Sequence, residues 1–259
     1  MLTSLQNPLV KEIRKLHQGK TRRQQGQFLL EGTHLLQEAL AVGHPLSVVC
    51  YTPAWQERHP DLAAALSQSA QRVEAVSEDV LQSLTTTVHP DGVVAVAPQR
   101  ATSAIPDLTG IGLMLETLQD PGNLGTIIRT AAAVQVDGLW LSADSVAPDH
   151  PKVLRASAGQ WFRLPMVVDH QVEDTLTIWR SQGIQLVATL PTARQDYWAV
   201  DFTRPTVILL GNEGAGISEP LQRQATITVN IPMHPAVESL NVAISAALLL
   251  YEAQRQRRG

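Results

Sequence analysis

Short apolar runs alternate with segments of helical periodicity along the chain, and this alternation restricts the fold more than any other feature of the sequence. In the N-terminal part, runs of strand length are separated by stretches in which apolar residues recur at helical spacing. Strands are expected at 28–30, 46–50, 72–76 and 93–97, and helices from Pro8 onward and at 33–41, 54–67 and 78–84. This order is typical of a small α/β domain, which we expect over residues 1–97.

Residues 98–109 contain two prolines and little apolar periodicity, so they are expected to form a linker between domains. A second alternating series follows. Its strands are expected at 111–115, 138–141, 184–189, 207–210 and 227–229, and its helices at 125–134, 172–182 and 240–256. We expect residues 110–259 to form an α/β domain with a mostly parallel sheet, helices on both faces and a ligand site at the carboxyl ends of the strands.

Composition excludes several classes of protein. Hydrophobic residues make up 44% of the 259 residues and charged residues 17%, which is enough apolar material for a sizeable core. The longest apolar run, 244–251, is far shorter than the ~20 residues that cross a membrane, and the charged N-terminus does not resemble a secretory signal. Cys50 is the single cysteine, and the histidines show no metal-ligand spacing. We therefore expect a soluble cytoplasmic protein with no membrane partner and no metal.

The net charge of −4 does not indicate a nucleic-acid-binding protein, but the basic residues are unevenly distributed. Within residues 1–30, six basic residues accompany a single acid, Glu12. Basic side chains neutralise phosphates, and arginine can contact them through two parallel hydrogen bonds. The cluster is thus either a nucleic-acid contact or a solvated helix face. Its members are Lys11, Arg14, Lys15, Lys20, Arg22 and Arg23.

The common nucleotide-binding and catalytic motifs are absent. The sequence has no P-loop, no G-x-S-x-G and no H-E-x-x-H pattern. G-x-G occurs at 110–112 and at 214–216, but neither is followed by the third glycine of a dinucleotide-binding turn. A Rossmann-type cofactor site therefore has no support.

Polar and glycine residues interrupt three junctions between an expected strand and an expected helix. The first, 118–125, follows strand 111–115 and opens a helix, so its backbone N–H groups can hold an anion. We expect Asn123 and Arg129 to face the strand ends together. The alternative is an ordinary turn with Asn123 as a cap and Arg129 on the surface.

The second junction, 209–218, has three glycines after a strand, which permit close approach of a ligand to the backbone, and it carries Glu213. The third, 231–241, contains two prolines that make the loop rigid before the last helix. Ser239 is a natural N-cap for that helix. Asn241, a weak helix former, would then lie in the first turn without a structural reason.

Together these segments resemble the SpoU (TrmH-type) RNA 2′-O-ribose methyltransferases of the SPOUT superfamily. The family's three motifs stand here as NLG with IRTA, LGNEGAGI, and IPM with SLNV, within residues 123–131, 210–217 and 231–242. Residues 7–11 and 28–32 look like the start of the substrate-binding domain that ribosomal-RNA members carry. One departure is Val134-Gln135, where family members often have Phe-Gly.

The resemblance implies S-adenosyl-L-methionine as cofactor and a deep trefoil knot in the C-terminal domain. Arg129 matches the arginine that acts on the ribose hydroxyl. Because a guanidinium is a poor proton acceptor, we expect it to stabilise the RNA phosphate and the developing oxyanion, with general-base action as the alternative. Asn123, Ser239 and Asn241 would position the substrate and the loop, and Glu213 would orient Arg129 or the cofactor. The expected cofactor contacts are Leu190, Gly211, Asn212, Glu213, Gly214, Ile231, Met233, Ser239 and Leu240.

The resemblance also implies partners. RNA is the expected substrate, with ribosomal RNA favoured over tRNA, and the N-terminal domain with its basic cluster would select it. A homodimer is expected through the last helix, which carries more apolar surface than one core face needs, at Val242, Ile244, Leu248, Leu249 and Leu250.

Three alternatives to this function stay open. One is a tRNA ribose methyltransferase. Another is a non-catalytic RNA-binding or assembly factor, which would be expected to lose Asn123, Arg129 or Asn241. The third is a SPOUT enzyme that methylates a base nitrogen.

Overall fold

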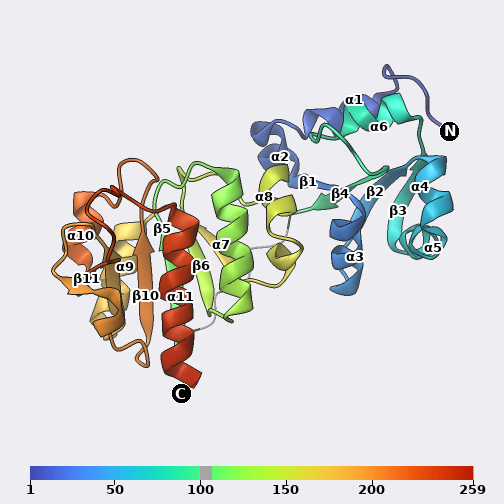
Figure 1. The fold of residues 1–259 in the computed structure, drawn as a ribbon. Helices are drawn as coiled ribbons and strands as arrows, with labels where there is room; N and C mark the ends of the chain where they lie inside the picture. The colour runs from blue at the N-terminus through green and yellow to red at the C-terminus, as the bar shows by residue number, and fades with distance from the viewer. Residues whose placement is uncertain (100–106, 259) are drawn as a thin grey trace. The chain divides into compact units, whose positions relative to one another are not determined.

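The computed structural model describes residues 1–99 and 107–258, which form two compact units (Figure 1). The first unit is Met1–Ala101 with Ala147–Phe162, and the second is Thr102–Val146 with Arg163–Gly259. Most of the expected linker, 100–106, lies outside the described residues. The second half of the chain thus contributes a segment to the first unit, a feature that the sequence did not predict.

A four-stranded sheet of order β1-β4-β2-β3 forms the first unit. Strands β1 (Gln27–Glu31) and β2 (Leu46–Tyr51) pair antiparallel with β4 (Val93–Pro98), and β2 pairs parallel with β3 (Ala70–Ala75). Its helices are α1 (Pro8–Lys15), α2 (Gly19–Gln25), α3 (Thr33–Ala41), α4 (Pro53–Arg58), α5 (Pro60–Ser69), α6 (Glu78–Leu84) and α8 (Pro151–Ala156), with a 3-10 turn at Gln160–Phe162.

Local sequence explains where the helices of this unit begin and end. The side chain of Asn7 accepts a hydrogen bond from the N–H of Leu9 at 2.9 Å, and Pro8 occupies the first helical position of α1. The expected helix 54–67 is wrong as a single element. It is two helices, α4 and α5, that meet at Pro60, which has no N–H to continue the hydrogen bonding of α4.

The second unit contains a seven-stranded sheet of order β7-β6-β5-β10-β8-β11-β9, with parallel pairing between all neighbours. The strands are β5 (Ile111–Leu115), β6 (Gly138–Ser142), β7 (Met166–Asp169), β8 (Gln185–Thr189), β9 (Gln195–Asp196), β10 (Thr206–Leu210) and β11 (Ile227–Asn230). The two central strands β5 and β10 are buried along their full length, as expected for a parallel sheet covered on both faces.

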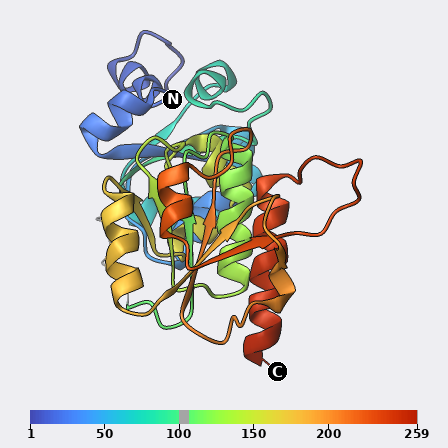
Figure 2. The ribbon, with the colours of Figure 1, turned by 90° about the vertical axis from the view of Figure 1, so that its left-hand side faces the viewer.

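Helices cover both faces of this sheet, which confirms the expected architecture. Helices α7 (Pro121–Ala133) and α11 (Val242–Arg258) pack side by side on one face, and α9 (Val172–Ser181) and α10 (Glu219–Gln224) lie on the other (Figure 1, Figure 2). Trp179 of α9 packs edge-on against Trp140 of β6, with ring centroids 4.7 Å apart. The trefoil knot stays a prediction.

Several element bounds differ from those expected. Helix α7 begins at Pro121 and not at 125, because Asp120 caps it and proline suits the first helical position. Helix α11 begins at Val242, two residues later than expected. Helices α8 and α10 and strands β7 and β9 were not predicted, since all are short. No helix in the described parts of the chain has the length and apolarity to cross a membrane.

Candidate active site

The three junctions singled out in the sequence lie at the carboxyl ends of β5, β10 and β11, at one edge of the parallel sheet. The loop 116–120 follows β5, the loop 211–218 follows β10, and the loop 231–241 follows β11. A fourth loop, 190–194, follows β8, which lies between β10 and β11. Parallel strands place their following loops at one edge of the sheet, where ligands of such folds bind.

Asp120 and Asn123 form the start of α7. The carboxylate of Asp120 accepts a hydrogen bond from the N–H of Asn123 at 2.9 Å, which satisfies one free donor of the first turn. Asn123 is therefore a residue of the helix and neither its cap nor part of a preceding turn. The Asp-Pro pair is a start signal for a helix, and reading it would have placed α7 correctly.

Glu213 joins the loop after β10 to the start of α7. Its carboxylate accepts hydrogen bonds from the N–H groups of Gln119 and Asp120, at 3.2 and 3.0 Å, and from the side-chain amide of Asn123 at 3.1 Å. Burial raises the pKa of Glu213, but these donors outweigh it and hold the pKa below its usual range. Glu213 is thus an ionised residue that fixes the two loops together.

Asn241 joins the third junction to the same group. Its side-chain amide donates to the side-chain oxygen of Asn123 at 2.9 Å, and its own oxygen accepts from the N–H of Ala243 at 2.9 Å. Asn241, and not Ser239, therefore caps α11. This explains an asparagine that had no structural reason when the helix was expected to start at 240.

The loop after β10 is closed by its own hydrogen bonds. The side-chain oxygen of Asn212 accepts from the N–H groups of Gly214 and Ala215, both at 2.9 Å, and its amide donates to the carbonyl of Thr117 at 2.9 Å. A Cβ at Gly211 would come within 2.1 Å of the backbone of Gly216. Gly211 is therefore required by the close approach of this chain to itself.

These loops line a cavity of about 390 Å³, within the ~300–1,000 Å³ usual for small-ligand sites. All nine residues expected to contact the cofactor line it. Thr189, Thr192, Gln222 and Ser245 also line it, and no motif in the sequence pointed to them.

Arg129 does not lie beside Asn123 as expected. Both belong to α7, and six positions turn a helix by roughly 240°, so the two side chains project from different faces. The side chain of Arg129 is exposed, and within the described residues its guanidinium has no hydrogen-bond or ion-pair partner.

The basic cluster lies on α1 and α2 of the first unit, and its members are not equivalent. Lys11, Arg14, Lys20 and Arg23 are exposed, and Lys15 pairs on the surface with Glu12. The sixth member, Arg22, is buried.

Arg22 is buried, with 2% of its side chain exposed, and its Nε lies 3.2 Å from the carboxylate of Asp149. Its guanidinium also donates to the carbonyls of Leu16 and His17, both at 3.2 Å. The expectation that Arg22 contacts RNA is therefore wrong, because the side chain is used inside the fold.

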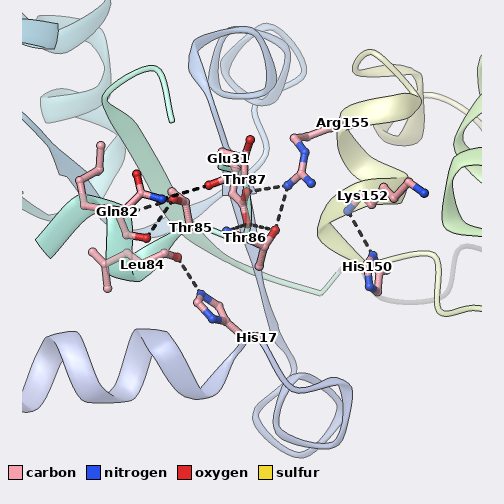
Figure 3. Close-up of polar contacts among 11 residues, drawn as sticks. His17, Glu31, Gln82, Leu84, Thr85, Thr86, Thr87, His150, Lys152 and Arg155 are labelled. Carbon is pink, nitrogen blue, oxygen red and sulfur yellow. Dashed lines mark hydrogen bonds and ion pairs between the residues drawn. The ribbon is translucent and has the colours of Figure 1, made fainter. Parts of the chain in front are cut away.

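Within the first unit, a second ion pair joins the segment 147–162 to strand β1 (Figure 3). Arg155 donates to the carboxylate of Glu31 at 2.6 Å and to the hydroxyl of Thr86 at 3.0 Å. The N–H and hydroxyl of Thr86 donate to the other carboxylate oxygen, at 3.0 and 2.8 Å. Glu31 is almost fully buried, so Arg155 supplies the charge that compensates it.

No group of three or more histidine, cysteine, aspartate and glutamate side chains that could hold a metal ion is present in the described portion of the chain.

Comparison with known proteins gives two family models, each matching one part of the chain. Residues 110–251 match the SpoU rRNA Methylase family, and residues 7–95 match the MRM3-like substrate binding domain. The two matched segments follow the order expected from the sequence, a substrate-binding part before a methyltransferase part.

Similar proteins match over nearly the full chain. An uncharacterized tRNA/rRNA methyltransferase of Synechocystis is 51% identical, covering 99% of this chain and 94% of its own. The 23S rRNA (guanosine(2553)-2′-O)-methyltransferase RlmP of Bacillus subtilis is 30% identical, with 96% and 97% covered. The SpoU methyltransferase AviRb of Streptomyces viridochromogenes, solved in complex with AdoMet, has a TM-score of 0.88 at 32% identity, covering 98% of this chain and 99% of its own.

Proposed function

The chain belongs to the SpoU rRNA methylase family, and we propose that it transfers a methyl group from S-adenosylmethionine to a ribose 2′-hydroxyl of ribosomal RNA. One observation carries this proposal. The three motif segments meet at the carboxyl ends of the strands, around a cavity lined by every residue expected to contact the cofactor. A non-catalytic RNA-binding protein on this fold would be expected to lose Asn123, Arg129 or Asn241, and all three are present.

The cavity suits S-adenosylmethionine in size and chemistry. Leu190, Ile231, Met233 and Leu240 provide an apolar wall for the adenine, and the loop after β10 brings backbone groups to the same space. When bound there, the cofactor supplies an activated methyl group. Glu213 and Asn212 fix the loop through hydrogen bonds, so the cavity is shaped before any ligand enters.

The protein must also help the ribose hydroxyl, which is a poor nucleophile near neutral pH. The guanidinium of Arg129 is exposed and has no protein partner among the described residues, so it is available to hold an RNA phosphate and the developing oxyanion. Asn123 and Asn241 fix the starts of α7 and α11, and Ser239, at the cavity wall, helps to position the substrate.

Ribosomal RNA is favoured over tRNA by the family model and by RlmP. The name of the family model states rRNA, and RlmP, similar over nearly the full chain, is a 23S rRNA enzyme. We assign RNA selection to the first unit, through Lys11, Arg14, Lys20 and Arg23. With ribosomal RNA as the substrate, we also propose a cytoplasmic location.

A homodimer through α11 completes the proposal. Three apolar side chains on this helix, Ile244, Leu248 and Tyr251, are 51%, 36% and 54% exposed, and their spacing places them along one stripe. Val242, Leu249 and Leu250, also expected at the interface, are instead buried in the core of their own unit. Light scattering should give twice the 28.2 kDa mass, and Ile244→Lys with Leu248→Lys should reduce it to that mass.

The function is tested with RNA from a strain that lacks the gene. The purified protein is incubated with methyl-labelled S-adenosylmethionine and either ribosomal RNA or tRNA, and the nucleosides are then separated by mass spectrometry. We expect 2′-O-methylnucleosides in ribosomal RNA alone. Label in tRNA would assign the tRNA function, label on a base would assign base methylation, and no label in either RNA would reject the enzyme.

A further inference from the structure

Thr117, which follows β5 by two positions, has an unusual backbone. Its φ is +51°, in the left-handed region that β-branched residues avoid because the Cβ crowds the backbone. A conformation of this kind persists only where surrounding contacts enforce it, and such residues cluster at functional sites. The contacts around Thr117 must therefore hold its backbone in this conformation.

Four hydrogen bonds to residues 142–146, at the end of β6 and just after it, hold Thr117 and its neighbour Leu118. The N–H of Thr117 donates to the hydroxyl of Ser142 at 2.7 Å, and its hydroxyl donates to the carboxylate of Asp144 at 2.7 Å. The N–H of Leu118 donates to the hydroxyl of Ser145 at 3.0 Å, and its carbonyl accepts from the N–H of Val146 at 2.7 Å.

Asp144 connects Thr117 to Ser142 through its two carboxylate oxygens. One of its carboxylate oxygens accepts from the hydroxyl of Thr117, and the other accepts from the hydroxyl of Ser142 at 2.5 Å. These two hydrogen bonds, the Ser142 bond first, hold the pKa of Asp144 below its usual range, so it is an acceptor at neutral pH. Neither Asp144 nor Ser142 belongs to the cavity or to the three motifs.

The carbonyl of Thr117 faces the loop 211–218 after β10, here called the cofactor loop. It accepts the hydrogen bond from the amide of Asn212, whose oxygen in turn orders the N–H groups of Gly214 and Ala215. The direction of that carbonyl depends on the left-handed backbone at Thr117. Asp144 thus acts on the cofactor loop through one residue that it holds in a strained conformation.

We propose that Thr117 and Asp144 are positioning residues of the cofactor site, with Asp144 holding the backbone of Thr117 so that its carbonyl fixes Asn212 and the loop 211–216. The inference rests on the proposed function in one respect only, the identity of the ligand that enters the cavity. The conformation of the loop is a property of the protein alone.

Calorimetric titration of the purified protein with S-adenosylmethionine tests the first consequence. Asp144→Ala and Thr117→Val should each weaken binding by roughly 5- to 30-fold, the effect of losing support for a strained residue. Thr117→Gly should bind nearly as well as wild type, since glycine adopts a positive φ without support. Adding Thr117→Gly to Asp144→Ala should restore binding to within ~3-fold of Thr117→Gly alone.

Asp201→Ala is the matched control. The carboxylate of Asp201 also accepts from a threonine hydroxyl, that of Thr203 at 2.5 Å, but lies before β10, at the opposite end of the strand from the cavity. Its replacement should leave binding unchanged. Denaturant unfolding of the same variants separates positioning from a general loss of stability, because glycine at a positive φ can also stabilise the protein. The change in affinity should persist under conditions in which every variant is fully folded.

Hydrogen exchange of the ligand-free protein gives a second measurement. Asp144→Ala should speed exchange at the amides of Gly214 and Ala215, and Thr117→Gly should restore the wild-type rate. Unchanged binding and exchange in Asp144→Ala, or no rescue in the double variant, overturns the proposal. Failure of the wild type to bind S-adenosylmethionine would reject the proposed function, while the exchange rates would still decide the role of Asp144.

Discussion

The side-chain amide of Asn241 donates a hydrogen bond of 2.9 Å to the side-chain oxygen of Asn123, across 118 positions of sequence. The amide of Asn123 then donates to the carboxylate of Glu213, so one chain of hydrogen bonds joins the three motifs. Each asparagine uses its oxygen as an acceptor and its nitrogen as a donor. Aspartate, which has the same shape and no donor when ionised, cannot replace either one.

Asn123→Asp should therefore make the site sensitive to pH. Two carboxylates would face each other at residues 123 and 213, and the repulsion would raise the apparent pKa of the pair. The variant should be less stable than wild type at pH 7 and should regain stability on acidification toward pH ~5 as the pair takes up a proton. Thermal unfolding across this range measures the effect.

The wild type should behave in the opposite way. The pKa of Glu213 lies below its ordinary value of 4.5, so its contribution is present above that pH and is lost as the pH falls through the lower, folded-state pKa. If the stability of Asn123→Asp did not rise relative to that of the wild type between pH 7 and 5, the result would contradict the arrangement of Asn123 and Glu213.

Replacing Arg129 separates catalysis from cofactor binding. Arg129→Ala should lower single-turnover methylation by ~10²-fold or more, the loss expected when one donor to a developing oxyanion is removed. The affinity for S-adenosylmethionine should stay unchanged, because Arg129 does not line the cavity. Arg180→Ala, which removes an exposed arginine from α9, should change neither quantity. Loss of cofactor affinity in Arg129→Ala would assign Arg129 to the cofactor pocket.

Two of the three glycines in the loop 211–218, Gly211 and Gly214, should respond differently to substitution by alanine. Gly211→Ala should destabilise the protein and abolish cofactor binding, because the new Cβ would collide with the backbone of Gly216. Gly214→Ala should fold normally, since a Cβ there would meet only the side-chain oxygen of Asn212 at 3.6 Å. Denaturant unfolding with calorimetric titration compares them. Equal behaviour of the two variants would be inconsistent with the close approach at Gly211.

The left-handed backbone of Gln135 lowers the stability of the protein. Its φ is +57°, and it ends α7 in a motif in which the N–H of Val136 reaches the carbonyl of Ala131 at 3.1 Å. Gln135→Gly should stabilise the protein by ~0.5–1 kcal/mol, because glycine tolerates this backbone at no steric cost. The midpoint of urea unfolding measures the change. Gln135→Ala should not stabilise.

The exposed and the buried residues of the basic cluster should have different effects, the exposed ones on RNA binding and the buried one on stability. Lys20→Ala with Arg23→Ala should leave stability unchanged and flatten the salt dependence of RNA binding by up to ~0.7 log unit for each lost contact with single-stranded RNA. Asp149→Ala should instead cost ~3–5 kcal/mol of stability, because Arg22 would be left buried without its partner. Filter binding at several salt concentrations measures the first effect, and denaturant unfolding the second. An unchanged slope would remove Lys20 and Arg23 from the RNA contact.

Sequence patterns predicted what depends on local chemistry. The apolar runs gave the main strands, because residues buried on both faces of a sheet are apolar whatever lies beside them. The motif glycines and the polar residues around them located the cavity, because parallel strands place their following loops at one edge of the sheet. Arg129 was misplaced relative to Asn123 because the start of α7 was set four residues too late.

What the sequence could not predict depends on long-range pairing. Nothing local distinguishes Arg22, a buried ion-pair partner, from Arg23, an exposed neighbour, until Asp149 is known to lie beside it. Asp144 and Thr117 are likewise ordinary residues in the sequence. Their importance comes from one backbone angle and from the hydrogen bonds that hold it.

The chain leaves the second unit after Val146, completes the first with residues 147–162 and returns at Arg163. The two parts are therefore not modules that can be exchanged by a single cut in the linker. A chimera joined at 98–109 alone would receive a foreign partner for the Glu31 carboxylate and for Arg22, each buried with an opposite charge. An exchange of the first unit between relatives, by evolution or by design, therefore needs three crossovers, one in the linker and one at each end of 147–162. The segment that carries Asp149 and Arg155 then stays with the Arg22 and Glu31 side chains that it neutralises.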